Sequence, residues 1–153
     1  RYQMAECVVE LHVAASPERT FEVFADISNA ATNVSAIKSV EMLTDLPMRP
    51  GTRWKETRVM FGQEATEEMT IEAVEAPSFY TATAESHGSR FLSRFDFEPK
   101  DGGTNVTMTF RSTPVSLYAK LMSPFSGAMI SAVSKVLQSD MHDLKGVAER
   151  HSS

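Results

Sequence analysis

The chain has 153 residues, 42% of them hydrophobic and 23% charged, with a formal net charge of -5. This length and composition suit one ordinary globular domain over residues 1–153. No apolar run approaches the roughly 20 residues that cross a bilayer, so no stable membrane insertion is expected. The acidic balance argues against a nucleic-acid partner. The chain has a single cysteine, and no leader is recognised before the first strand, so a cytoplasmic location is the default expectation.

The first third of the chain predicts a strand, one or two short helices and a second strand. Apolar and polar residues alternate over residues 4–14, which is typical of a half-buried strand. Ser16 followed by Pro17 has the residue types of a helix N-cap and a first helical position. A helix starts there, a weaker one is expected over residues 29–34, and a strand over residues 36–44.

A meander of five strands is predicted from residue 52 to residue 112, followed by one long helix. The turns are marked by glycine or proline at residues 61–63, 76–77, 87–88 and 100–103. Apolar residues at helical spacing, Met129 among them, then predict an amphipathic helix over residues 115–149, the only element long enough to cover the sheet. Pro124 is expected to kink this helix and, with Gly127, to let its first third move as a gate.

Strand register identifies the face of the meander that points inward, because side chains alternate across a strand and each turn pairs two strands. The turns place Phe97 opposite Val106, and place small residues in the middle of the same face. The remaining predicted inner pairs are Phe95 with Met108, Ser93 with Phe110, Ala84 with Phe91, Ala82 with Ser93, and Tyr80 with Phe95.

The same trace puts three further residues of the next strand, Met69, Ile71 and Ala73, on the inner face. Trp54, Glu56 and Arg58 follow from the turn near residue 62. Inward-facing charges need partners, so we expect Arg58 to pair with Glu56 or Glu67. This pair either holds a polar group of a ligand or lies in water at a hairpin tip.

The small inner residues Ala82, Ala84 and Ser93 leave room for a cavity under the helix, as a ligand pocket requires. Larger side chains of the helix filling the same space are the alternative. Signals for chemistry are weak: the four histidines, at positions 12, 87, 142 and 151, form no metal-binding pair, and Cys7 has the setting of a core residue. We recognise no catalytic motif and expect no metal or cofactor.

Several motifs together resemble the START-like SRPBCC superfamily, the polyketide cyclase/dehydrase and lipid-transport family. They are the first strand, the helix start at residues 16–21, the break at residues 25–29, residues 51–54 and the closing helix, and the resemblance covers residues 5–149. It implies an α+β helix-grip fold, in which a curved antiparallel sheet of about seven strands wraps around a long C-terminal helix. It also implies a deep apolar cavity, with lipids, hormones, quinones or aromatic polyketides as ligands.

The leading hypothesis is a START-like domain that binds or transports a small hydrophobic or amphipathic molecule, as a monomer or weak homodimer. A cyclase or dehydratase is the second, with Arg58 polarising a carbonyl group and Glu56 or Tyr80 moving a proton. An interaction module, such as a co-chaperone or a quinone-carrier partner, is the third. The predicted ligand-binding residues are Trp54, Glu56, Arg58, Met69, Tyr80, Ala82, Phe91, Ser93, Phe95, Met108, Phe110, Met122 and Phe125.

Overall fold

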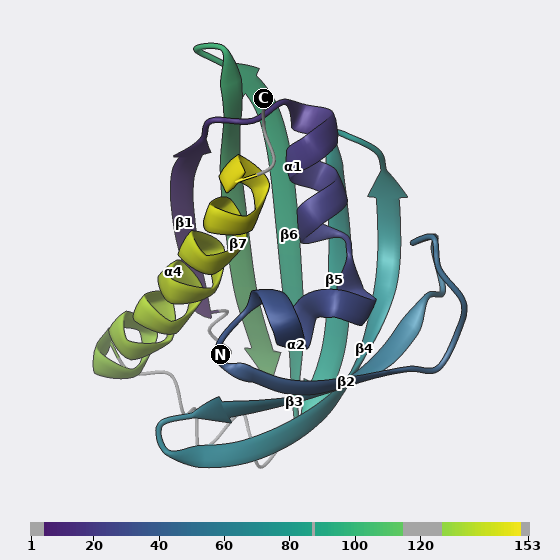
Figure 1. Cartoon of the computed structure of the whole chain (residues 1–153). Helices are drawn as coiled ribbons and strands as arrows, with labels where there is room; N and C mark the ends of the chain where they lie inside the picture. The colour runs from purple at the N-terminus through teal and green to yellow at the C-terminus, as the bar shows by residue number, and fades with distance from the viewer. Residues whose placement is uncertain (1–4, 87, 115–126, 151–153) are drawn as a thin grey trace.

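Figure 1 shows the computed structural model, which describes residues 5–86, 88–114 and 127–150. Seven strands and a C-terminal helix make up most of it, with three short helical segments after the first strand. In chain order the elements are β1 (Ala5–Val13), α1 (Pro17–Phe24), η1 (Ile27–Asn29), α2 (Ala30–Asn33), β2 (Ile37–Met42), β3 (Arg53–Met60), β4 (Gln63–Glu75), β5 (Phe79–Ser86), β6 (Ser89–Lys100), β7 (Gly103–Pro114) and α4 (Gly127–Arg150).

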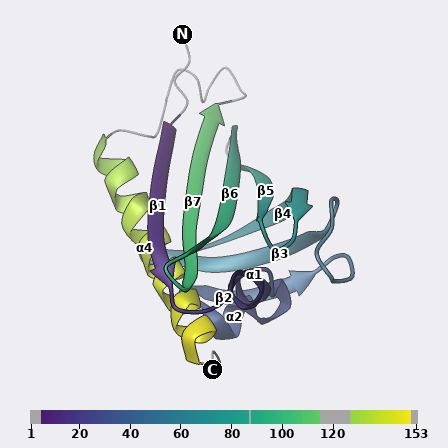
Figure 2. The ribbon, with the colours of Figure 1, turned by 90° about the horizontal axis from the view of Figure 1, so that it is seen from above.

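The strands form one antiparallel sheet in the order β1-β7-β6-β5-β4-β3-β2. The sheet curls, so that β2 comes round to the side where the helices lie (Figure 2). Helix α4 packs against β1 and α1, and α2 packs against β2 and α4. The predicted helix-grip architecture, a curved seven-stranded sheet around a C-terminal helix, is therefore confirmed.

The predicted register is confirmed across β5, β6 and β7. Phe97 pairs with Val106, and Ser93 pairs with Phe110 on one side and with Ala82 on the other. These pairs follow from the lengths of the turns, which can be recognised in the sequence. In the 100–103 turn, for example, the two central residues have positive φ, as a tight hairpin requires. A row of inner-facing residues thus runs across three strands.

Two residues predicted to face inward do not. The pairing of β4 with β5 shifts between Ile71 and Ala73, and this bulge places Ala73 opposite Thr81, on the outer face. Met129 is 38% exposed, because the buried stripe of α4 runs through Val133 and Met141 and reaches the first turn at Ile130. Residues 115–126, with the predicted kink at Pro124 and two predicted ligand contacts, Met122 and Phe125, lie outside the described residues.

Helix α1 begins as its sequence predicts. The Ser16 hydroxyl accepts a hydrogen bond from the Arg19 amide at 3.1 Å, and Pro17 occupies the first turn, where it sacrifices no hydrogen bond. Phe21 and Phe24 are then buried on one side of the helix, against the inner face of the sheet. The cap therefore determines where α1 begins, and the spacing of Phe21 and Phe24 determines which side of it covers the sheet.

The C-terminal end of α4 is tied to the end of β1 by charged side chains. The Glu149 carboxylate accepts a hydrogen bond from the Ala14 amide at 2.8 Å, and Lys145 donates to the His12 carbonyl at 2.6 Å. The hydrogen bonds from Ala14 and from Lys145 hold the pKa of Glu149 below its ordinary value. Nearer the middle of α4, Asp143 accepts from the amide and hydroxyl of Ser35, both at 2.9 Å.

Two glycines are expected to respond in opposite ways to alanine. A Cβ at Gly103 would overlap the Val13 carbonyl oxygen of the adjacent strand, whereas a Cβ at Gly146 in α4 would meet nothing closer than 3.5 Å. Gly103→Ala is expected to lower the free energy of unfolding by about 2 kcal/mol. Gly146→Ala is expected to raise it by about 1 kcal/mol, because alanine is the better helix former. Urea unfolding measures both, and equal effects would contradict the packing described for β1 and β7.

Candidate functional site

One end of the inner face is closed by an aromatic cluster under α1. Tyr80 and Phe95 stack with ring centroids 4.9 Å apart, and Phe97 lies edge-on to Phe21 at 5.2 Å and to Phe24 at 5.4 Å. Such contacts add to the stabilisation from area burial. This end of the sheet is packed core.

Tyr80 belongs to that core. Its side chain is buried, and its hydroxyl donates a hydrogen bond to the Phe24 carbonyl at 3.1 Å. Burial, with a smaller effect from the charge of Glu56, raises the pKa of Tyr80 far above its ordinary value. The single proton of Tyr80 is therefore already engaged, and the residue is a poor candidate for proton transfer or for a polar contact to a ligand.

The middle and opposite end of the inner face carry small residues and a second aromatic pair. Ala82 lies opposite Ser93, so two small side chains occupy the centre. Phe91 and Phe110 stack at the far end with centroids 5.7 Å apart, and both remain only half-buried, as does Ser93. Small side chains therefore occupy the middle of the inner face, where the cavity was predicted, and an aromatic pair lies beyond them.

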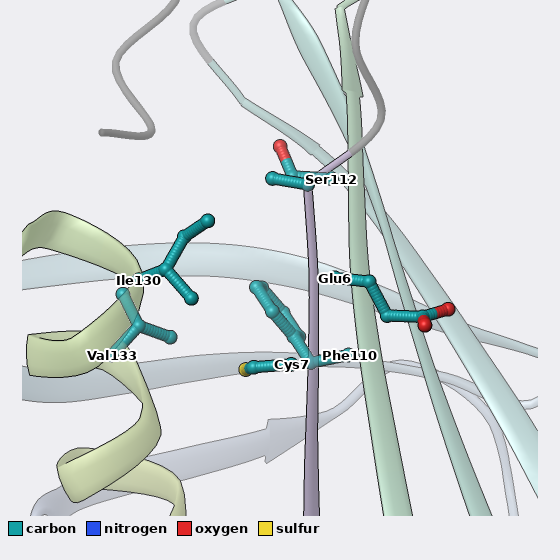
Figure 3. Close-up of a pocket in the computed structure, with 7 residues that line it drawn as sticks. Glu6, Cys7, Phe110, Ser112, Ile130 and Val133 are labelled. Atoms are coloured by element: carbon teal, nitrogen blue, oxygen red, sulfur yellow. The ribbon is translucent and has the colours of Figure 1, made fainter. Parts of the chain in front are cut away.

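A small apolar pocket opens at that end, between the sheet and the first turns of α4. The Cys7 thiol and the Phe110 ring point toward Ile130 and Val133 of the helix, while the Glu6 carboxylate points to the other side of the sheet (Figure 3). The pocket volume is about 10 Å³, enough for about one water molecule. Burial raises the pKa of Cys7, which agrees with a lining role and not with a reactive thiolate.

A chain of polar contacts crosses from the sheet to α4 on the inner face. The Trp54 indole donates to Glu56 at 3.3 Å, and Arg58 Nε donates to the other oxygen of Glu56, also at 3.3 Å. Arg58 Nη2 donates to Asp140 Oδ2 at 2.8 Å. Only 15% of the Arg58 side chain and 14% of the Asp140 side chain are exposed, so this is an interior ion pair and not the water-exposed hairpin tip of the alternative prediction.

The electrostatics of this cluster reflect its burial. Burial raises the pKa of Asp140 by more than the charge of Arg58 lowers it. Burial by itself would lower the pKa of Arg58, but the negative charges of Asp140 and Glu56 and their hydrogen bonds have a larger combined effect and raise this pKa. Arg58 Nη1 and Asp140 Oδ1 are buried without a hydrogen-bond partner within the described structure. Unsatisfied groups of this kind are costly, so the pair has unused capacity for a polar group.

Asp140 was not among the predicted site residues, although the sequence carried a signal for it. Asp140 lies three residues after Leu137 and four before Leu144, and is thus an acid within the apolar stripe of the helix. An acid at such a position needs a partner from the facing element. The predicted pairing of Arg58 with Glu56 is confirmed, and Glu67, the alternative partner, lies opposite Glu56 on β4.

The remaining predicted site residues within the described ranges lie on the inner face as traced. Trp54 is buried and pairs with Met69 on the adjacent strand, and Met108 is buried in the core. Within the described ranges, no group of three histidine, cysteine or acidic side chains is arranged to hold a metal ion.

Fold and inner face together define a START-like protein, with a curved sheet whose inner face meets a C-terminal helix. Residues 4–149 match the family described as polyketide cyclase / dehydrase and lipid transport, and the chain belongs to this family. No curated protein matches the chain by sequence.

Solved structures with the same fold cover nearly the whole chain. A START superfamily protein from Mycobacterium smegmatis is 19% identical, with 96% of this chain and 97% of that one covered, at a TM-score of 0.74. TTHA0849 from Thermus thermophilus is 18% identical, with 97% and 100% covered, at 0.78. The di-domain ARO/CYC StfQ from the steffimycin biosynthetic pathway is 9% identical at 0.75, with 96% of this chain and 52% of StfQ covered. These similarities show the fold.

The interior ion pair should behave differently from an exposed one. Arg58→Met is expected to lower the free energy of unfolding by about 3 kcal/mol, because it leaves Asp140 buried without its partner. The double variant Arg58→Met/Asp140→Leu should lose much less than the sum of the two single variants, with a coupling above about 1 kcal/mol.

The matched control is the pair of Arg53 and Glu68 on the outer face, joined at 2.9 Å but 46% and 45% exposed. Its coupling is expected to stay below about 1 kcal/mol. Double-mutant cycles in urea measure both couplings. Equal values for the two pairs would show that the Arg58–Asp140 pair is as solvated as a surface pair.

Proposed function

We propose that the protein binds a small hydrophobic or amphipathic molecule between the inner face of the sheet and the C-terminal helix. The observation that carries this proposal is a group of inward-facing side chains that are only half-buried. Phe91, Ser93 and Phe110 lie beyond the aromatic cluster on the inner face, and each remains half-buried. A ligand at this place would complete the burial of these side chains.

The inner face offers both an aromatic and a charged surface, and this combination suits an amphipathic molecule. The Phe91–Phe110 stack offers aromatic surface, while Arg58 and Asp140 each keep one buried polar atom without a partner in the described structure. A largely apolar molecule with one polar group could contact both. Family membership supports this proposal, because the family is described by cyclase or dehydrase activity and by lipid transport. In the part of the chain that the structure describes, no helix has the length and hydropathy of a membrane span.

Filling the centre of the inner face should abolish binding. Ser93→Phe places a ring opposite Ala82, in the space assigned to the ligand. Binding of the neutral dye Nile red, followed by fluorescence, is expected to weaken at least about tenfold, equivalent to about 1.4 kcal/mol. The control Thr83→Phe adds the same ring to the outer face of β5 and should leave the affinity unchanged. Equal affinities in both variants would place the dye elsewhere.

A co-purifying molecule would identify the ligand directly. Native mass spectrometry of protein purified from its own host should show a bound mass that is lost in Ser93→Phe and retained in Thr83→Phe. The two variants introduce the same side chain on opposite faces of neighbouring strands. They therefore distinguish binding in the interior from non-specific binding to the surface. A bound mass that persists in both would count against an interior site.

A cyclase or dehydratase acting at the same place is the second candidate, favoured by the interior position of Arg58 between two carboxylates. There Arg58 would polarise a carbonyl group and Glu56 would move a proton. StfQ, whose fold the chain shares, is an ARO/CYC protein, which keeps this chemistry open. Glu56→Gln should then abolish turnover of a bound poly-ketone while leaving its affinity intact. Loss of affinity alone would indicate a binding role.

An interaction module is the weaker alternative. It requires a continuous exposed apolar patch. The large exposed hydrophobic residues within the described ranges lie on three separate elements: β1 carries Val8, the β3–β4 hairpin carries Val59 and Phe61, and α4 carries Met129. This distribution gives the interaction hypothesis no single surface to rest on.

A further inference from the structure

A second hollow lies on the outer face of the sheet, away from the helices. Its volume is about 330 Å³, within the range of small-molecule sites. The sheet itself separates it from the inner face, because Arg94 lines the hollow and its neighbours Ser93 and Phe95 point inward. The hollow is lined by Ala73, Phe79, Thr81, Leu92, Arg94 and Arg111, together with Glu72 and Thr109.

The bulge in β4 lies at one side of the hollow. Regular alternation would place Glu72 outward and Ala73 inward, but the register shift brings both to the outer face. Ala73 pairs with Thr81, which in turn pairs with Arg94, so a short side chain borders the longer ones on this face. The bulge therefore adds a small residue to the lining of the hollow.

The floor and wall of the hollow suit a flat apolar group. The Arg94 guanidinium carbon lies 4.2 Å from the centroid of the Phe79 ring, so this surface already accepts planar stacking. Leu92, two residues before Arg94 on the same face of β6, is half-buried. Thr81 is only 6% exposed, and its hydroxyl has no hydrogen-bond partner within the described ranges.

Two arginines supply positive charge at diagonal positions of the sheet. Arg94 of β6 is opposite Thr109 of β7, and Arg111 lies two residues after Thr109 on β7. Residues in this diagonal relation are about 7 to 8 Å apart. Each arginine is held from one side by an acid: Arg94 donates Nε and Nη2 to Asp96, and Arg111 donates Nε to Glu6 at 2.6 Å.

These ion pairs leave donors for a ligand. Arg94 Nη1 and both terminal nitrogens of Arg111 make no hydrogen bond to the described part of the protein. Terminal guanidinium nitrogens suit the planar geometry of a carboxylate. The acid that lines the hollow, Glu72, is paired with Arg90 at 3.4 Å.

We propose that this outer hollow binds a small carboxylate carried on a flat apolar body. The body would lie against Phe79 and Leu92, and the carboxylate would accept hydrogen bonds from Arg94 and Arg111. This site is independent of the proposed interior site, since it uses the opposite face of the same strands. The protein would then carry two ligand sites with different chemistry, an apolar interior one and an anionic outer one.

An amide NMR titration with naphthoate tests the proposal, with neutral naphthalene methanol as the matched analogue. Naphthoate is expected to shift amides around Phe79, Leu92 and Thr109, and the neutral analogue is not. Arg111→Gln should weaken naphthoate binding about tenfold, about the value of a hydrogen bond to a charged group. Arg53→Gln, which removes an outer-face arginine away from the hollow, should have no effect.

Two further variants make the result independent of the interior site. Thr109→Phe fills the hollow and should abolish the shifts, whereas Ser93→Phe blocks the interior and should leave them unchanged. The proposal would be overturned if naphthoate and its neutral analogue bound equally well, or if neither bound. It would also be overturned if the shifted amides lay only on the inner face, or if Arg53→Gln weakened naphthoate binding as much as Arg111→Gln. A failure of Nile red binding alone would overturn the interior site and leave the outer one standing.

Discussion

Successive side chains of a strand point to opposite faces of the sheet, and every site described in this protein depends on that alternation. Along β6, Ser93 faces the helix while Leu92 and Arg94 face away from it. One backbone thus supports the interior surface on one side and a charged surface on the other. The shift in this pattern at Ala73 is also where the outer hollow forms.

The interior combines a packed aromatic cluster with a buried ion pair. Its aromatic end is packed as a core, with Tyr80 sealed by its hydrogen bond to Phe24, and this packing stabilises the sheet against α1. Between β3 and α4 it holds an ion pair, Arg58 with Asp140, that a stability argument alone does not explain. Replacing a buried ion pair by hydrophobic residues of similar volume is often neutral or stabilising. The proposed recognition of a polar group would give this pair a role that folding alone does not require.

Much of the fold could be predicted because its signals are local. A turn marked by glycine indicates where one strand ends and the next begins. Once the turn is located, the pairing of residues along the two strands follows, including that of Ser93 with Phe110. The bulge at Ala73 has no comparable local signal: neither glycine nor proline marks it. Its cause lies in how β4 fits β5 on a curved sheet, which is a property of the assembled structure.

The candidate site was predicted less completely because half of it comes from another element. Glu56 and Arg58 could be placed together from one strand, but their connection to Asp140 spans 82 residues and depends on how α4 packs. The acid within the helix stripe indicated that a partner was needed, and the inward arginine indicated the same from the sheet. Two unpaired opposite charges on facing apolar surfaces are therefore a usable signal for contact.

The position of the charges bears on which chemistry the interior could support. A proton-transfer residue needs a pKa near the working pH and an unengaged proton or lone pair. Tyr80 meets neither condition, whereas Asp140 has its pKa raised by burial and keeps one oxygen without a partner in the described structure. In the proposed cyclase or dehydratase, a carboxylate beside Arg58, Glu56 or Asp140, would therefore move the proton, and not Tyr80 at the aromatic end of the sheet. The same two atoms, Arg58 Nη1 and Asp140 Oδ1, would instead orient the polar group of a ligand if the role is binding, so both functions depend on one ion pair.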